Sequence, residues 1–207
     1  MILPIYTYGS PVLRERTRLV ESDSEDLQSL INDLVETMNG ASGVGLAAPQ
    51  VGRNERVFVV DVRAVQEEDE AGGQSSEPHA AAPPSFGPLV FINPKLEIIE
   101  GNRVEFEEGC LSIPDLREDV LRPEAIWIRF LDRDFEPREF EVDGLLARVI
   151  QHEFDHLDGV LFVDHLSPIK RRLIRRRLRE MARGEVTAEY PIITSADKKR
   201  QTSGSIS

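Results

Sequence analysis

Residues 151–159 read Gln-His-Glu-Phe-Asp-His-Leu-Asp-Gly, and the rest of the chain can be organised around them. Histidines four positions apart on a helix lie on the same face, so both imidazoles can reach one metal ion. The glutamate between them is then placed beside that ion, as in hydrolytic HExxH sites. Asp143 is expected to cap this helix and Gly159 to end it, with apolar residues at helical spacing in between. A chance occurrence of HExxH is the alternative that other parts of the sequence have to exclude.

The composition is typical of a soluble protein with one main domain. Its 207 residues are 40% hydrophobic, which is enough for one sizeable core. No apolar run is long enough to cross a bilayer, and residues 1–4 do not begin a signal peptide, so we expect a cytoplasmic protein without a membrane partner. The net charge of −12 argues against a protein that binds DNA or RNA over its whole surface. The single cysteine, Cys110, excludes a disulfide within the chain.

Hydrophobic periodicity predicts further helices and strands before the HExxH helix. Apolar residues at helical spacing from Leu27 to Met38 predict an amphipathic helix that ends at Gly40, and residues 22–25 resemble a capping box before it. The first 20 residues are interpreted as an arm that lies over the core. Segments rich in Val, Ile and Phe predict strands at 56–62, 89–99, 103–106, 125–131 and 136–142.

Composition separates three segments from the main domain at 1–167. Residues 64–88 are acidic and then rich in Gly, Ser, Ala and Pro, so we interpret them as a mobile insertion loop between two strands. A strongly basic helix is predicted at 168–184. The polar residues 185–207 are expected to form a flexible tail.

Two histidines alone do not hold a catalytic metal well, so a third ligand has to be found. Metalloproteases with the extended HExxHxxGxxH motif use a third histidine, but this chain has Phe162 at that position. Among downstream glutamates that could be the third ligand, Glu180 lies in the basic helix, and Glu185 and Glu189 lie in the expected tail. Neither place suits a buried metal ligand. Cys110 remains, and its thiolate together with two imidazoles gives three ligands and one position open for water.

Three short motifs together resemble the peptide deformylase family, whose enzymes remove the formyl group from the N-terminus of new bacterial polypeptides and release formate. The motifs are GVGLAAPQ at 43–50, EGCLS at 108–112 and QHEFDHLDG at 151–159, which is the order that the family has. Their coincidence is far more specific than HExxH alone, and it replaces the plainer interpretation of 43–50 as an ordinary tight turn. We therefore expect an α+β fold, with antiparallel β-sheets around the central HExxH helix, an N-terminal helix and a C-terminal basic helix. Residues 1–167 become the catalytic domain.

The resemblance implies a role for each motif. Glu153 is the general acid and base. The side-chain amide of Gln50 and the backbone N–H of Leu111 stabilise the oxygen that becomes negative during the reaction. The physiological metal is implied to be iron(II), Fe²⁺, with Ni²⁺, Co²⁺ or Zn²⁺ able to replace it, although the ligand types alone do not separate iron from zinc. The implied metal ligands are Cys110, His152 and His156.

The HExxH helix also predicts a substrate preference. Leu145 and Val149 share the face that carries the two histidines. With Val44 they are expected to form an apolar pocket for the methionine side chain of an N-formyl-methionyl nascent peptide. By the resemblance, the peptide backbone is held by Gly45, Gly109 and Arg117.

Some alternatives stay open. The basic helix at 168–184 could be an ordinary solvated surface, whereas the resemblance implies that it docks on ribosomal RNA. A metallopeptidase that cuts internal peptide bonds is a second functional class, and the absence of the third histidine at Phe162 argues against it. A non-catalytic metal-binding module is a third class, but it gives no reason for Glu153 to lie beside the ligands.

Overall fold

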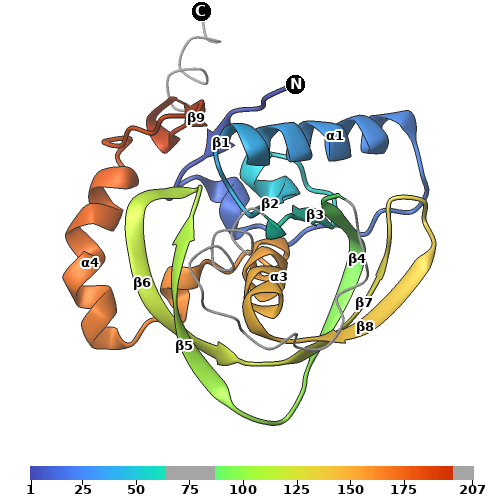
Figure 1. Cartoon of the computed structure of the whole chain (residues 1–207). Coiled ribbons are helices and arrows are strands. Elements are labelled where there is room, and N and C mark those ends of the chain that lie inside the picture. The colour runs from blue at the N-terminus through green and yellow to red at the C-terminus, as the bar shows by residue number, and fades with distance from the viewer. Residues whose placement is uncertain (64–86, 198–207) are drawn as a thin grey trace, which may run out of the picture.

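The computed structural model describes residues 1–63 and 87–197, and it has the predicted α+β fold (Figure 1). The helix that carries the HExxH motif, α3 (Gly144–Leu157), lies in the centre of the molecule. In chain order, the elements before it are β1 (Ile5–Tyr6), η1 (Pro11–Arg14), α1 (Glu25–Gly40), β2 (Gly45–Ala47), η2 (Ala48–Val51), β3 (Val57–Val60), β4 (Leu89–Ile98), β5 (Arg103–Cys110), β6 (Ile113–Pro123), β7 (Ile126–Leu131) and β8 (Pro137–Val142). After it come η3 (Phe162–Asp164), α4 (Pro168–Met181) and β9 (Ile192–Ile193).

The five-stranded antiparallel sheet has the strand order β2-β3-β4-β7-β8; its strands β2 and β3 are buried on both faces, whereas β8 is largely exposed. Side chains alternate between the two faces of a strand, so β3 sends Phe58 and Val60 into the hydrophobic cluster that contains α3. Val57 and Val59 point the other way, into the cluster that contains α1. The continuous apolar sequence of this strand therefore follows from burial on both sides, and it fixes α3 against the sheet.

α1 begins two residues later than the capping signature predicted. Ser24 is the N-cap, with an extended backbone (φ −156°, ψ 156°), and its Oγ accepts a hydrogen bond from the backbone N–H of Leu27 at 3.2 Å. The predicted box from Ser22 to Glu25 is therefore wrong in its register, while the helix and its end at Gly40 are confirmed.

The predicted limits of α3 are confirmed. Asp143 occupies the N-cap position, although its side chain makes no capping hydrogen bond, and the helix ends at Leu157. Gly159 follows with φ +73°, a conformation that side chains rarely tolerate. A Cβ atom there would also lie only 2.6 Å from the carbonyl oxygen of Arg14. Glycine is required here because the N-terminal arm passes directly beside the end of the helix.

β5 and β6 form a separate two-stranded antiparallel ribbon, and two predictions about it are wrong. The strand expected at 103–106 continues to Cys110, so the cysteine lies at the end of a strand rather than in a loop. β6 was not predicted. Its burial alternates from Pro114 to Arg122, but the inward-facing positions include Glu118 and Arg122 as well as Leu116 and Val120, so the sequence lacks the apolar alternation by which strands are recognised.

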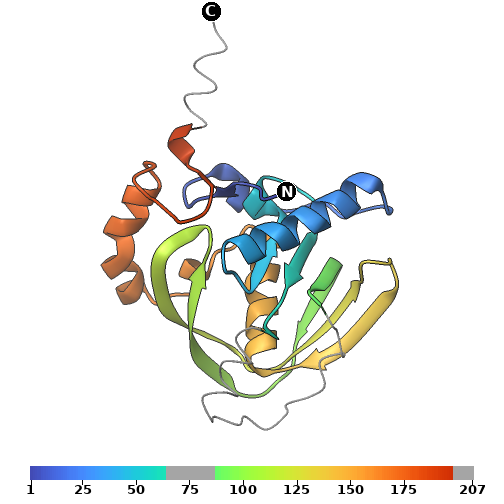
Figure 2. The same ribbon diagram turned by 45° about the horizontal axis from the view of Figure 1, so that its top comes forward.

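The prediction of a flexible tail from residue 185 is also wrong for 185–197. β9 pairs in parallel with β1, and Figures 1 and 2 both show this segment beside the N-terminal arm. The N–H of Ile5 donates to the carbonyl of Pro191 at 2.9 Å, and the N–H of Thr7 donates to that of Ile193 at 3.0 Å. Residues 198–207 lie outside the described residues, as does the predicted insertion loop except for positions 87 and 88.

α4 begins after Ser167 and packs along the outside of the β5–β6 ribbon (Figure 1). Its apolar residues Ile174, Leu178 and Met181 are buried in a third cluster, together with residues of β6. Its outer face carries most of the arginines of the helix. In the described part of the chain, no helix combines the length and the apolar character that a membrane crossing requires.

Candidate metal centre

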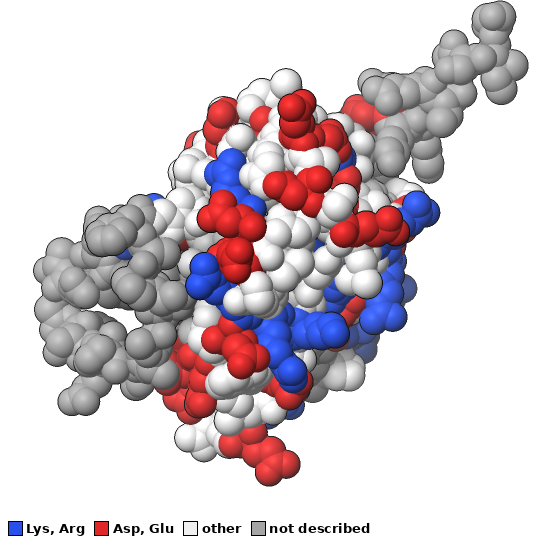
Figure 3. All heavy atoms as spheres, turned by 90° about the vertical axis from the view of Figure 1, so that its right-hand side faces the viewer, with Lys and Arg blue, Asp and Glu red and all other residues white. Residues whose placement is uncertain are grey.

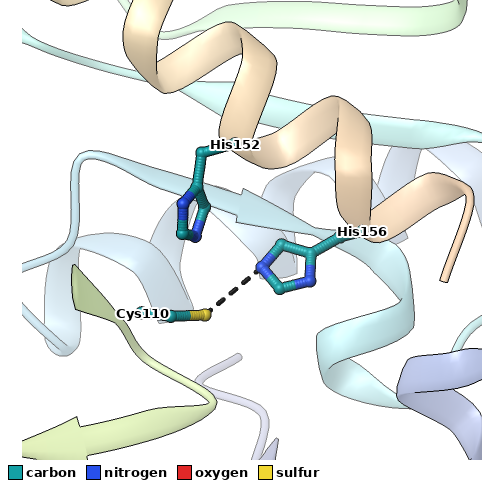
Figure 4. Close-up of side chains that lie close together, drawn as sticks. All are labelled: Cys110, His152 and His156. Carbon is teal, nitrogen blue, oxygen red and sulfur yellow. Dashed lines mark hydrogen bonds between the residues drawn. The ribbon is translucent and has the colours of Figure 1, made fainter. Parts of the chain in front are cut away.

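One sulfur and two imidazoles converge between β5 and α3 (Figure 4). His152 and His156 lie one turn apart on α3, and Cys110 faces them from the end of β5. One ligand atom of each residue lies within 4.8 Å of those of the other two. The Sγ of Cys110 is 3.3 Å from Nε2 of His156. The structure thus brings the three predicted ligands together, in a donor set that suits a divalent metal ion with an open position.

The surroundings of Cys110 favour its ionised form. Burial alone would raise the pKa of this thiol, but the charge of His156 and hydrogen bonds with both histidines outweigh burial and lower the pKa to about 5. The thiolate is the form in which cysteine binds a metal. The chemistry of the donor set therefore fits a metal site better than an inert core thiol.

Glu108 fixes the ring of His152. Its Oε2 lies 2.9 Å from Nδ1 of His152, which leaves Nε2 of that ring for a metal. Arg122 donates to both carboxylate oxygens of Glu108, at 2.7 and 3.0 Å, and Arg148 donates to Oε1 at 3.0 Å. Burial would raise the pKa of Glu108, but the hydrogen bonds with His152 and Arg122 hold it well below its usual value. The ring of His152 is therefore held by a carboxylate whose ionised form is favoured by these hydrogen bonds.

This network around Glu108, with Arg122 and Arg148, was not predicted from the sequence. Arg148 is buried on α3 and also donates to the carbonyls of Val104, at 2.5 Å, and Val120, at 2.9 Å. It thereby ties α3 to both strands of the ribbon that carries Cys110. The available signal was its position one turn before His152, on the face that was expected to be buried, because a buried arginine requires partners.

Glu153 lies beside the ligands with its carboxylate against the backbone of Gly45. A Cβ atom at Gly45 would lie 2.5 Å from Oε1 of Glu153. Oε2 of this residue is buried and has no hydrogen-bond partner among the described residues. Burial raises the pKa of Glu153 to about 7, although the charges of His152 and His156 act in the opposite direction. A carboxyl group with a pKa near neutrality is suited to both taking up and releasing a proton.

Gln50 presents an N–H group to the same space. Its Oε1 accepts the backbone N–H of Ala47 at 2.8 Å, which fixes the orientation of the amide. Nε2 then points into the site, 3.6 Å from the Sγ of Cys110 and 3.3 Å from the Oγ of Ser112. Leu111 follows Cys110 in the turn between β5 and β6. The two predicted oxyanion donors therefore lie next to the predicted metal ligands.

The residues predicted to bind substrate fall into two groups. Val44 and Leu145 are partly buried and pack in the same cluster as Val149, as an apolar pocket requires. Gly109 lies opposite Arg117 in the ribbon. The Arg117 side chain is 69% exposed and 3.6 Å from Glu107, so it lies at the surface rather than inside the site.

Phe162 has a structural place next to the centre. It is fully buried, and its ring stacks on that of His152 with a centroid distance of 6.0 Å. Phe162 stands where extended metalloprotease motifs have a third histidine. Here it supports the ring of His152 by packing against it.

An HExxH helix that meets a cysteine from an antiparallel ribbon defines a metallohydrolase of the α+β class. The sequence matches the profile of the family described as polypeptide deformylase over residues 2–172. A peptide deformylase of Salinibacter ruber is 52% identical over 198 residues, which cover 96% of this chain and 97% of that protein.

Solved structures give the same result. The peptide deformylase of Legionella pneumophila is 39% identical, with a TM-score of 0.71, and the match covers 89% of this chain and 98% of that one. The enzyme of Ehrlichia chaffeensis is 32% identical, with a TM-score of 0.76 over 90% of this chain and 100% of that one. The chain belongs to the polypeptide deformylase family, whose metal-dependent hydrolases remove the N-formyl group from nascent peptides. The predicted family and enzyme class are confirmed.

Proposed function

We propose that this chain hydrolyses the formamide bond of formyl-methionyl peptides with a divalent metal ion held by Cys110, His152 and His156. The supporting observation is the convergence of these ligand atoms within 4.8 Å, next to the buried carboxylate of Glu153. When bound there, the ion lowers the pKa of a coordinated water from about 15.7 towards about 7, so that hydroxide is available near neutral pH.

Each remaining step is carried by side chains or backbone groups of the chain. Glu153 takes the proton from the attacking water and later gives it to the departing amine. As the formyl carbon becomes tetrahedral, its oxygen gains negative charge, and Nε2 of Gln50 and the N–H of Leu111 donate hydrogen bonds to it. Glu108 keeps the ring of His152 in one orientation throughout.

We propose iron(II) as the physiological ion, with nickel, cobalt or zinc able to replace it. One thiolate and two imidazoles are acceptable ligands for all of these ions, so the donor set supports the proposal without selecting one of them. Metal analysis of protein purified without oxygen and without added metal identifies the bound ion.

The apolar group formed by Val44, Leu145 and Val149 supports methionine as the first side chain of the substrate. An unbranched thioether fills such a slot without leaving a polar group unpaired. Gly45, Gly109 and Arg117 are proposed to hold the peptide backbone beyond it. Because this substrate is a newly made polypeptide, we propose that the protein acts in the cytoplasm, where translation takes place.

The test is formate release from formyl-Met-Ala-Ser, measured for the wild type, Glu153→Gln and Glu105→Gln. Loss of a general acid and base typically lowers kcat by about 10²- to 10⁴-fold, so Glu153→Gln should be nearly inactive while it retains its metal. Glu105 is exposed on β5, and its amide variant is the control that should keep full activity. Unformylated Met-Ala-Ser separates the two enzyme classes, because its cleavage would indicate a metallopeptidase. Equal activity of wild type and Glu153→Gln would reject the mechanism.

We also propose that α4 docks on ribosomal RNA. The helix exposes arginines along its outer face, including Arg172, Arg175 and Arg177. The opposite side of the molecule carries acidic side chains interspersed with basic ones (Figure 3). Because the chain as a whole has a net charge of −12, the attraction for RNA phosphates is concentrated at this one basic helix.

The structure determines how this docking should be tested. Deleting α4 would also remove Ile174, Leu178 and Met181 from the third cluster, so exposed charges should be changed instead. The variant with glutamate at positions 172, 175 and 177 should lose co-sedimentation with ribosomes. The control variant has glutamate in place of Arg129, Arg133 and Arg138, which lie on the β7–β8 side of the molecule. Equal co-sedimentation of both triple variants would exclude α4 as the docking helix.

A further inference from the structure

The turn formed by Leu111 and Ser112 is held from three sides. The side chain of Tyr190 donates a hydrogen bond to the carbonyl oxygen of Leu111 at 2.8 Å. The backbone N–H of Tyr8 donates to the carbonyl of Ser112 at 2.8 Å, and Nε2 of Gln50 lies 3.3 Å from its Oγ. Tyr190 lies beyond residue 172, where the match to the family profile ends.

The segment that carries Tyr190 is itself fixed to the body of the protein. On one side, β9 pairs with β1 directly after Pro191. On the other, the hydroxyl of Ser195 donates to the carbonyl of Ala182, after α4, at 2.6 Å. The ring of Tyr190 packs against the cluster that contains α1, as does Leu111. Burial raises the pKa of Tyr190, so its hydroxyl remains a proton donor at neutral pH.

We propose that Tyr190 is a positioning residue for the reaction, because it fixes the turn whose first N–H is the proposed oxyanion donor. This inference rests on the role proposed above for Leu111. The carbonyl and the N–H of Leu111 belong to two peptide units joined only by its own φ and ψ. Because the hydroxyl of Tyr190 holds the carbonyl of Leu111, rotation about φ and ψ of Leu111 is restricted. The N–H of Leu111 therefore cannot turn far from its position in the site.

The consequence for catalysis is preorganisation. An oxyanion donor acts only when it lies about 2.7–3.1 Å from the oxygen that gains charge, and misplaced groups lose much of their effect. The hydrogen bond from Tyr190 should therefore matter more in the transition state than in the bound substrate, so kcat should depend on it more strongly than KM.

The test compares Tyr190→Phe with Ser195→Ala. Each substitution removes one hydroxyl of the segment 190–195 that donates to a backbone carbonyl. The hydroxyl of Tyr190 donates to Leu111, whereas that of Ser195 donates to Ala182. With formyl-Met-Ala-Ser, Tyr190→Phe should lower kcat about 10-fold, less than the 10²- to 10³-fold loss for a whole donor, and leave KM within about twofold. Ser195→Ala should keep the kcat of the wild type. Metal content and the melting temperature are measured for each variant.

Three results would overturn this role. The first is an unchanged kcat in Tyr190→Phe, and the second is an effect on KM alone. The third is an equal loss of kcat in both variants, which would mean that the segment acts only through general stability. A wild-type protein that releases no formate would overturn the proposed function itself, whereas an active wild type with an unaffected Tyr190→Phe overturns only the role of Tyr190.

Discussion

The missing side chain at Gly45 allows Glu153 to lie beside the proposed metal ligands. A Cβ atom added there would lie 2.5 Å from Oε1, 2.7 Å from Cγ and 2.8 Å from Cδ of Glu153. All three distances are shorter than atoms tolerate, so an alanine would have to displace the carboxylate. Glu153 is buried on a packed helix and cannot move without losing its place relative to the ligands.

Gly45→Ala should therefore act as a nearly complete loss of Glu153, the proposed general base. We expect kcat for formyl-Met-Ala-Ser to fall by at least about 10²-fold, because proton transfer by a positioned group contributes about 10²- to 10⁴-fold. Steady-state kinetics and metal analysis check this, since the metal ligands are untouched and the metal content should stay at the wild-type level. Gly101→Ala is the matched control, because no atom lies within 4 Å of the Cβ position there. Activity of Gly45→Ala within twofold of the wild type would show that Glu153 does not need this space.

At the scale of single residues, the ligands were easier to predict than the residues that support them. The two histidines carry a local signal, four-residue spacing on one helix, and Cys110 is the only cysteine. Arg122 and Arg148 meet Glu108 from positions 14 and 40 residues away, where spacing in the sequence carries no information. Such a network follows only from the tertiary fold, because it is the fold that buries the charges together.

α4 differs sharply between its two faces. Leu178 is 6% exposed in the third hydrophobic cluster, whereas Leu173, one and a half turns away, is 75% exposed. Leu178→Ala should lower the free energy of unfolding by about 2–5 kcal/mol, because it leaves a cavity in a packed cluster. Leu173→Ala removes the same atoms from a solvent-exposed side chain and should change the free energy of unfolding by less than about 0.5 kcal/mol. Urea unfolding measures both values, and equal effects would mean that α4 is not docked in the way described.

Asp164 and Arg14 connect the segment after α3 to the N-terminal arm. Nη2 of Arg14 lies 3.2 Å from Oδ1 of Asp164, and the N–H of Leu161 donates to Oδ2 at 2.9 Å. Burial would raise the pKa of Asp164, but the hydrogen bonds from Arg14 and Leu161 lower it below its usual value. Since the pKa is lower in the folded state than in the unfolded state, the stabilisation is present above about pH 4 and is lost as the pH falls through the folded-state pKa.

Asp164→Asn should therefore be less stable than the wild type at pH 6, and this difference should shrink as the pH falls towards 3. Melting temperatures of both proteins across this range provide the measurement. Arg14→Met breaks the same pair from the other side and should show the same trend. A difference that stays constant with pH would assign the effect of the substitution to something other than the ionised carboxylate.

At the scale of elements, regular periodicity decided what could be predicted. α1 and α3 were found because their apolar residues recur at helical spacing, α4 because of its run of basic residues, and the central strands because both of their faces are apolar. β6 was missed because its inward-facing positions include Glu118 and Arg122, so its apolar residues do not alternate in the sequence. β9 has two residues, and it is a strand only because the N-terminal arm lies beside it. Elements that depend on a distant partner have no local pattern.

The proposed metal centre lies at the junction of two hydrophobic clusters. Cys110 packs at the edge of the cluster beneath α4, while the helix that carries both histidines belongs to the cluster between α3 and the sheet. An ion shared by the three ligands would join the β5–β6 ribbon to the central helix. The stability of the whole molecule should therefore depend on the metal, because the folded state alone holds the ligands together.

Adding zinc to metal-free protein should raise the unfolding midpoint. A ligand that binds only the folded state at 100 times its dissociation constant stabilises it by about 2.7 kcal/mol. His156→Ala removes one ligand and should lose most of this increase. His165→Ala is the matched control, because His165 contacts Asp155 on the same helix but is not among the three ligands, and it should keep the full increase. Thermal unfolding with and without zinc tests both. An equal response of the two histidine variants would place the stabilising zinc elsewhere in the protein, and the shared ion could then not be what joins the ribbon to α3.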